Sequence, residues 1–392
     1  MEKILIRKNK VKDIFTLICI SVIIYIFYAV SSNVNKGFYI NLIMLLLILV
    51  KSKLSIFSII GIIFFYPQIS YFFQYNMNES YGVFQLMINT GQYNLYYEES
   101  QLYAFIFLWG VYSFLMLSNI LELEKKMLKR KYYISNKAVN IISVIAISAT
   151  IICFPNIPFT NWGTDNRFWT NALLPGTAWN HVALISIIIL TVARFKDNIV
   201  AKGTVVVVVF IFLSNFERVD MLGYFLTIAL YWTANNMDKI SLKRIFLLAI
   251  SVVLILFLNA FIGEFRQGIE NISFLFLVKK VIIQNTATDI AYLYNSTIDY
   301  INMNPLRDTS FYYYNLLSII PGLDSFFDVE SVGSFINRLY RGPGGEFILI
   351  QPLIDFGYTS ILPFVYAYMS ILNFILKRKN DFFFLLYLFL SQ

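Results

Sequence analysis

The basic residues of this chain are spread unevenly over the connections between its apolar runs. They concentrate in every second connection, at positions 3–12, 51–53, 125–137, 194–202, 239–244 and 377–379. The alternate connections hold only Lys36, Arg167, Arg218, Arg266, Lys279, Lys280, Arg307, Arg338 and Arg341. Short loops rich in Lys and Arg stay on the cytoplasmic side of a membrane. The pattern therefore predicts a polytopic membrane protein whose N-terminus is cytoplasmic.

The apolar runs have the lengths that membrane-spanning helices require. The chain is 58% hydrophobic and 14% charged, with a mean hydropathy of +0.66, outside the usual range of soluble domains. The long runs are 14–30, 54–73, 102–121, 245–262 and 353–376, and the shorter ones are 38–50, 138–154, 181–193, 203–214, 221–235 and 381–392. Because about 20 apolar residues cross a bilayer, we expect an all-α bundle of about eleven crossings, within a range of about ten to twelve.

One integral membrane domain, 1–392, accounts for the whole pattern. The first run lacks a signal-peptide cleavage site, and Cys19 and Cys153 lie within apolar runs, where we expect them to pack. The longest outer connection, 263–352, belongs to the same domain. Its segments 274–283 and 286–300 are predicted helices, the first lying in the membrane interface or re-entering it.

Several function classes are disfavoured by what the sequence lacks. It contains no Walker A sequence, HExxH, CxxC or G-x-S-x-G. The net charge of +8 arises in loops expected to face anionic lipid, so nucleic acid is not an expected partner. An enzyme working outside without ATP must use a substrate that is already activated.

Three arginines in the outer connections are the best candidates for binding such a substrate. Arg218, Arg266 and Arg341 lie in predicted outer connections, where the positive-inside rule makes basic residues uncommon. A guanidinium group binds phosphate oxygens in bidentate fashion and stays charged. Together they suit a diphosphate with a lipid tail in the bilayer. The alternative is that they reach lipid headgroups or pair with carboxylates such as Asp220 and Glu264.

The same connections supply candidates for a general base. His181 is the only histidine, a residue type that often serves as a general base, and the carboxylates Glu264, Asp220 and Glu346 lie near the arginines in sequence. Each of them also has a simpler explanation, as a polar anchor or a salt-bridge partner.

Aromatic residues and a further arginine in these connections are candidate glycan contacts. Sugar rings stack on aromatic faces, so Trp169 and Tyr340, with Arg167, are expected to bind substrate. Trp and Tyr also gather at membrane interfaces when no ligand is involved.

The arrangement resembles the Wzy-type O-antigen polymerases, which polymerise oligosaccharide repeat units. The first matching element is an outer Arg after an apolar run, in 213–218 (LSNFER). The second is an Arg shortly after a later helix, in 263–266 (GEFR). The third is a glycine-rich stretch with an acidic residue, 344–346 (GGE), followed by Asp-Phe-Gly at 355–357. The number of predicted helices and the large late outer loop also agree with this family.

The resemblance implies a specific reaction. Such enzymes transfer a growing glycan from undecaprenyl diphosphate to the next lipid-linked repeat unit, in O-antigen (lipopolysaccharide) or capsule biosynthesis. Arg218, Arg266 and Arg341 would stabilise the departing diphosphate, and Glu264, Asp220 or His181 would be the base. It also implies the bacterial cytoplasmic (inner) membrane, an active site facing outside, and a flippase and a chain-length regulator as partners. We expect no cofactor and no metal.

Three other functions stay open. An O-antigen ligase shares the layout but has a histidine in its large loop, and 263–352 contains none. A flippase or transporter of lipid-linked sugars is expected to carry charges at mid-membrane and structural repeats, whereas these runs have almost no central charge. A non-enzymatic assembly partner would use the large loop as an interaction surface and would need no clustered arginines.

Overall fold

The computed structural model describes residues 2–53, 55–77, 96–129, 133–154, 178–193, 195, 198–214, 221, 223–225, 227–229, 231–232, 254, 257, 260–261, 273–282, 287–304, 331–340 and 350–378. Across these residues the fold is helical and contains no β-strand. Its elements are α1 (Glu2–Val30), α2 (Lys36–Ser52), α3 (Ile56–Met77), α6 (Tyr97–Leu117), α7 (Ile120–Leu128), α8 (Asn136–Cys153), α9 (Ala178–Val192), α10 (Ile199–Ser214), α13 (Phe274–Ile282), α14 (Ala287–Met303), α17 (Val332–Tyr340), α18 (Ile350–Phe356), η3 (Tyr358–Ser360) and α19 (Ile361–Lys377).

Within the described part of the chain, five helices are long and apolar enough to cross a membrane. They are Val11–Val30, Ile56–Phe73, Tyr97–Leu117, Asn136–Cys153 and Tyr358–Lys377. Large apolar side chains stay exposed along them; in α1, Phe15 is 66% exposed and Tyr25 is 74% exposed. Lipid is the solvent that accommodates such a surface. These helices indicate an all-helical membrane protein.

Most of the predicted helices that fall on described residues are present. Six of the predicted crossings lie, apart from at most two residues at one end of a run, in α1, α2, α3, α8, α9 and α10. They are the runs 14–30, 38–50, 54–73, 138–154, 181–193 and 203–214, and α3 covers the third of them from Ile56 on. The loop helices 274–283 and 286–300 correspond to α13 and α14. The run 381–392 and most of 245–262 lie outside the described residues, as does part of 221–235. The total of eleven crossings therefore stays a prediction.

One predicted run is not a continuous helix. The run 353–376 is interrupted at Gly357, where α18 ends and η3 leads into α19. Gly357 has φ 76° and ψ −170°, a backbone region that is essentially restricted to glycine. Hydropathy cannot detect this break, because the residues on both sides of it are apolar.

The run 102–121 also ends earlier than predicted. α6 stops at Leu117 because Ser118 is extended, and α7 begins at Ile120. Glu124 of α7 is buried, and its Oε1 accepts the backbone N–H of Ile56 at 2.8 Å. That N–H is one of the amides at the start of a helix that have no partner within the helix. α7 therefore caps α3 and does not prolong α6.

The first of two compact units comprises residues 1–124, 282–312 and 331–377. α2, α3 and α6 pack on one another, α1 lies against α2 and α6, and α19 lies against α6. Stacked rings join the helices, with centroids 4.1 Å apart for Phe38 and Phe72 and 3.5 Å apart for Phe64 and Phe107. Apolar rings thus form much of the contact between α2, α3 and α6.

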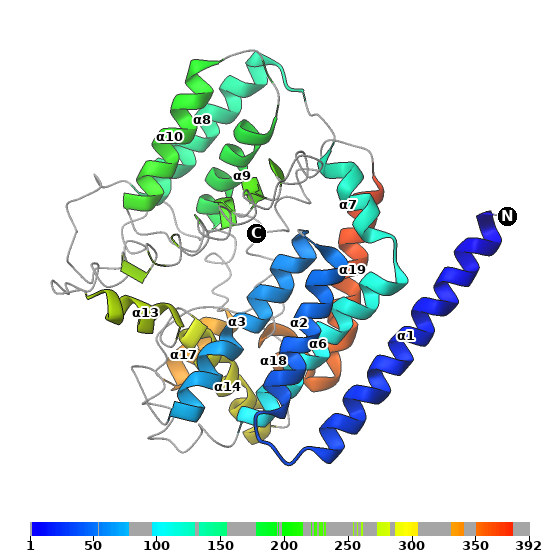
Figure 1. Ribbon diagram of the computed structural model, residues 1–392. Coiled ribbons are helices and arrows are strands. Elements are labelled where there is room, and N and C mark those ends of the chain that lie inside the picture. Colours follow the sequence, from blue (N-terminus) through cyan, green and yellow to red (C-terminus); the bar gives the residue numbers. More distant parts are fainter. Residues whose placement is uncertain are drawn as a thin grey trace. The chain divides into compact units, whose positions relative to one another are not determined.

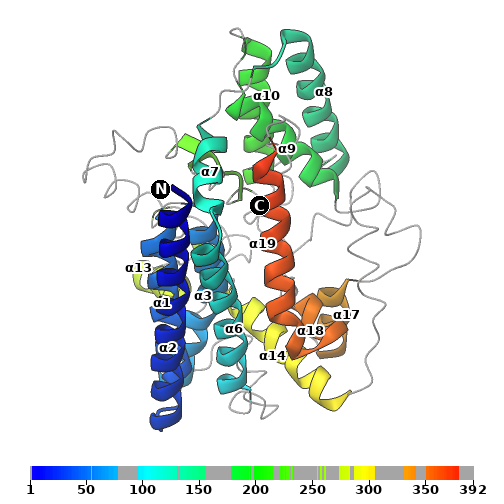
Figure 2. The same ribbon diagram turned by 90° about the vertical axis from the view of Figure 1, so that its right-hand side faces the viewer.

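α14, α17 and α18 gather at one end of this unit. Figures 1 and 2 both show them near the first residues of α6 and α19. α14 packs on α3, α6, α17 and α18. A helix from the connection 263–352 is therefore an integral part of the first unit.

The second unit comprises residues 125–281, 313–330 and 378–392. α8, α9 and α10 pack on one another around a core that includes Val139, Leu190 and Ala201. α8 begins where the Ser135 side chain accepts the backbone N–H of Ala138 at 3.3 Å, a normal helix N-cap.

Candidate functional site

Two of the ten predicted site residues are described by the structure. The others lie outside the described residues: Arg218, Arg266, Glu264, Asp220, Arg341, Glu346, Arg167 and Trp169. Their predicted roles stay predictions. His181 belongs to the second unit and Tyr340 to the first.

His181 lies in the first turn of α9 with its side chain exposed. Its backbone N–H donates a hydrogen bond to the Oδ1 of Asn180 at 3.0 Å. Asn180 itself is buried. This geometry is that of a helix start, and it assigns no chemical role to the imidazole.

Tyr340, the last residue of α17, is held by contacts at both its side chain and its main chain. Its hydroxyl donates to Oδ2 of Asp299 at 2.8 Å, and its carbonyl accepts the hydroxyl of Tyr292 at 2.6 Å. Its ring packs on a buried cluster that includes Tyr71 and Tyr97. The predicted glycan contact is thus part of a polar network built on α14.

The middle of α14 is buried on every side although it carries several polar residues. The nine consecutive residues 291–299 are all buried, which covers more than two helical turns. They include Asn295, Ser296, Thr297 and Asp299. Burying a polar group without a hydrogen bond costs about 1–3 kcal/mol, so such groups usually have a structural partner or a function.

Asp299 accepts a phenol on each of its carboxylate oxygens. Its Oδ1 accepts the hydroxyl of Tyr96 at 2.7 Å, and its Oδ2 accepts that of Tyr340. Tyr96 is the residue that precedes α6 and lies 203 residues from Asp299 in sequence. The carboxylate therefore joins the start of α6, the end of α14 and the end of α17.

A second set of polar contacts adjoins the first along the same two helices. The Tyr103 hydroxyl donates to Glu99 on α6, and the Tyr358 hydroxyl donates to Asn302 on α14. The rings of Tyr103 and Tyr358 are stacked, with centroids 4.6 Å apart and planes inclined by 9°. We refer to the whole group as the tyrosine–acid cluster: Tyr96, Glu99, Tyr103, Asp299, Asn302, Tyr340 and Tyr358.

The phenols of Tyr96 and Tyr340 remain proton donors at neutral pH. Burial, together with the hydrogen bond to Asp299, raises the pKa of Tyr96 to about 12. The same two causes raise the pKa of Tyr340 above its ordinary value of 10. Both hydroxyls are therefore protonated under physiological conditions, as their hydrogen bonds to a carboxylate require.

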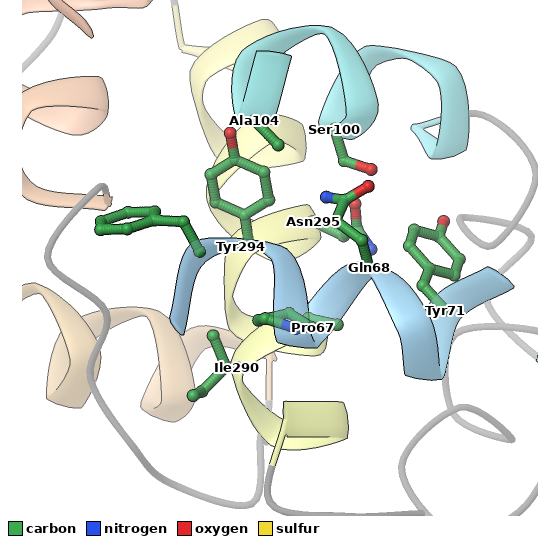
Figure 3. A pocket seen from close by; sticks show the side chains of 10 residues that line it. Pro67, Gln68, Tyr71, Ser100, Ala104, Ile290, Tyr294 and Asn295 are labelled. Atoms are coloured by element: carbon green, nitrogen blue, oxygen red, sulfur yellow. The ribbon is translucent and has the colours of Figure 1, made fainter. Parts of the chain in front are cut away.

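A small cavity, lined mostly by apolar groups, lies beside the cluster, between α3, α6 and α14. Figure 3 shows Gln68, Ser100 and Asn295, one from each helix, pointing toward the same space. The cavity has a volume of about 10 Å³, room for about one water molecule. Asn295 is 1% exposed, and neither polar atom of its amide has a hydrogen-bond partner among the described residues.

The chemistry available here is recognition of hydroxyl groups. Carboxylates accept hydroxyl protons, and the half-buried rings of Tyr96, Tyr340 and Tyr358 offer faces on which a sugar ring can stack. In the part of the chain that the structure describes, no group of three or more His, Cys, Asp or Glu side chains is arranged to hold a metal ion.

Sequence reasoning identified Tyr340 but not Asp299, Tyr96 or Glu99 as site residues. A signal for the α14 residues was present, because Asn295, Asp299 and Asn302 recur at intervals of four and three and so share one helix face. Nothing local indicated that this face would be buried against α6.

The chain was compared with known proteins by sequence and by structure. No protein-family model, no curated protein and no solved structure matches it.

Proposed function

We propose that this protein is a membrane glycosyltransferase that polymerises lipid-linked oligosaccharide repeat units on the outer face of a bacterial cytoplasmic membrane. The growing glycan is transferred from undecaprenyl diphosphate to a hydroxyl of the next lipid-linked unit. The new glycosidic bond forms as the bond to the diphosphate breaks, and the hydroxyl proton passes to a base. Arg218, Arg266 and Arg341 neutralise the departing diphosphate.

The observation that carries the proposal is the position of α14. This helix comes from the longest predicted outer connection, yet it is enclosed by α3, α6, α17 and α18. Its Asp299 binds Tyr340, the residue immediately before Arg341. Arg341, a residue predicted to bind the diphosphate, therefore follows directly in sequence on a cluster suited to binding sugar hydroxyls.

The late element of the family resemblance adds support. Asp355, of the Asp-Phe-Gly sequence, is buried in α18 and accepts the side-chain amide of Gln351 at 2.7 Å. α18 packs on both α14 and α17. The described residues of this element thus adjoin the helix that carries Asp299.

The proposal is tested by a gel of surface polysaccharide from cells in which the gene is deleted and then restored. We expect deletion to leave glycans of a single repeat unit and the wild-type gene to restore a ladder. Arg266→Ala should abolish the ladder. Arg307→Ala, which removes another arginine from the same outer connection, should leave it intact.

Three outcomes of this gel oppose the proposal. An unchanged ladder in the deletion strain excludes polymerisation. Loss of all glycan from the lipid A core, with polymer still attached to its lipid carrier, identifies a ligase. If Arg266→Ala and Arg307→Ala weaken the ladder equally, Arg266 has no specific role in binding the diphosphate.

One observation favours a second function, transport of lipid-linked sugars. α3 contains Pro67, which lines the small cavity together with Gln68. α3 is continuous through this proline, but a proline within a membrane helix beside buried polar groups is also a feature of transporter binding sites. A transporter predicts that repeat units accumulate in the inner leaflet when the gene is deleted, whereas a polymerase predicts accumulation in the outer leaflet.

A further inference from the structure

The two carboxylates of the tyrosine–acid cluster differ in what they leave for a ligand. Asp299 is 7% exposed, and each of its oxygens accepts a phenol. Glu99 is half-buried: its Oε1 accepts the hydroxyl of Tyr103, and no described residue forms a hydrogen bond with its Oε2. An ionised carboxylate is purely an acceptor. Glu99 can therefore take a proton from a ligand, whereas both oxygens of Asp299 are engaged by side chains of the protein.

The contact with Tyr103 fixes the direction of the Glu99 carboxylate. Tyr103 lies about one turn further along α6 and is 5% exposed. Its ring is stacked on that of Tyr358, with centroids 4.6 Å apart, and the Tyr358 hydroxyl donates to Asn302. A phenol enclosed in this way has little freedom to move. Glu99 thus has the oriented partner that a general base requires.

Glu99 lies at the end of a membrane helix that is predicted to face outside. It is in the first turn of α6, which is long and apolar enough to cross a membrane. The predicted outer segment 74–101, in which Glu99 falls, contains no Lys or Arg. Phosphate groups are bound mainly by cationic side chains, so this end of α6 is suited to hydroxyl groups and not to a diphosphate. The sugar of a lipid-linked unit is expected at this level, directly outside the bilayer.

We propose that Glu99 is the general base of the transfer: its Oε2 accepts the proton of the attacking hydroxyl on the acceptor sugar. As the proton leaves, the hydroxyl oxygen bonds to the anomeric carbon of the donor glycan. The bond from this carbon to the diphosphate breaks, and its electron pair stays on the diphosphate. Glu99 then releases the proton to water. This inference rests on the proposed polymerase function and deepens it by naming the base.

The test measures polymer formation in membranes of the deletion strain that carry each variant. The probe is the lipid-linked repeat unit extracted from that strain, supplied over a range of concentrations. We expect Glu99→Gln to lower turnover at least about 100-fold, with a smaller change in KM, because general-base catalysis contributes about 100- to 10,000-fold. The glutamine amide oxygen still accepts the Tyr103 hydroxyl, so this variant keeps the packing of the cluster.

Glu98→Gln is the matched control. Glu98 is the neighbouring carboxylate in the first turn of α6, and its side chain is exposed. This variant should keep wild-type turnover. Equal losses in Glu98→Gln and Glu99→Gln would overturn the inference, as would wild-type turnover in Glu99→Gln.

Added formate separates a base from a carboxylate that only supports the fold. Glu99→Ala removes the carboxylate and leaves space in which a small carboxylate from solution can accept the proton. Sodium formate should therefore restore part of the turnover of Glu99→Ala, whereas sodium chloride at the same concentration should not. A folded Glu99→Ala protein that formate does not activate would overturn the inference. The elution profile in detergent reports folding, and Glu99→Gln decides if the alanine variant does not fold.

Failure of the inference and failure of the proposed function are distinguishable. If wild-type membranes form polymer and Glu99→Gln membranes form it equally fast, the function stands and Glu99 is not the base. If wild-type membranes form no polymer from the lipid-linked unit, the proposed function is wrong, and the inference fails with it.

Discussion

The amide of Asn295 and the carboxylate of Asp299 are one helical turn apart on α14, and they differ in how they are satisfied. Asp299 accepts two phenols, whereas the polar atoms of Asn295 have no hydrogen-bond partner among the described residues. A satisfied buried carboxylate organises its neighbours, and an unsatisfied buried amide costs about 1–3 kcal/mol. An energetic cost of this kind is typical of a group that has a function.

Replacing Asn295 by leucine, which has the same branched shape but bulkier methyl groups, separates stability from function. We expect Asn295→Leu to raise the free energy of unfolding by about 1 kcal/mol, because a buried polar group without a partner is removed. The measurement is the thermal midpoint in detergent. If the cavity serves the reaction, polymer formation falls although stability rises.

Asn41→Leu is the matched control for this substitution. Asn41 is equally buried, but its amide nitrogen donates to the carbonyl of Gln101 at 3.0 Å. Its replacement removes this buried hydrogen bond and should lower the midpoint. A fall of equal size in both variants would contradict the account of Asn295.

At the scale of the secondary-structure elements, sequence reasoning placed most described helices but not their ends. Apolar runs specify a helix because a crossing needs about 20 apolar residues. They do not specify where it breaks. The end of α6 depends on the extended backbone of Ser118, and the start of α19 depends on the positive φ of Gly357. Neither is visible in hydropathy.

Gly357 gives a direct test of the break before α19. Gly357→Ala places a side chain at φ 76°, and we expect it to lower the free energy of unfolding by about 1–3 kcal/mol. Gly203→Ala is the control, since Gly203 is in α10 and an added Cβ meets nothing within 4 Å. That substitution should raise stability by about 0.5–1 kcal/mol. If the thermal midpoints of the two variants moved in the same direction, the assignment of a glycine-dependent break at Gly357 would be refuted.

At the scale of the whole molecule, sequence reasoning gave the class of protein and one residue of the cluster. Composition and the distribution of Lys and Arg are properties of the whole sequence, so they indicate a helical membrane protein without knowledge of contacts. The cluster depends on pairs far apart in sequence, such as Tyr96 with Asp299 and Tyr103 with Tyr358. A single sequence does not encode such pairs in any local pattern.

Cysteine labelling tests the predicted topology. In a background without Cys19 and Cys153, a membrane-impermeant maleimide should label Ser32→Cys and Met303→Cys in intact spheroplasts. Lys126→Cys, in α7, should react only after the membrane is permeabilised. Each of the three side chains is exposed. Labelling of Met303→Cys only from the inside would place α14 on the cytoplasmic side and contradict the proposed outer site.

The most direct test of the central claim is mass spectrometry of the lipid-linked oligosaccharides that accumulate when the gene is deleted. The account predicts undecaprenyl diphosphate bearing one repeat unit, with longer glycans returning when the wild-type gene is restored. Undecaprenyl diphosphate bearing long polymer in the deletion strain would contradict the account, because the chain would then grow without this protein.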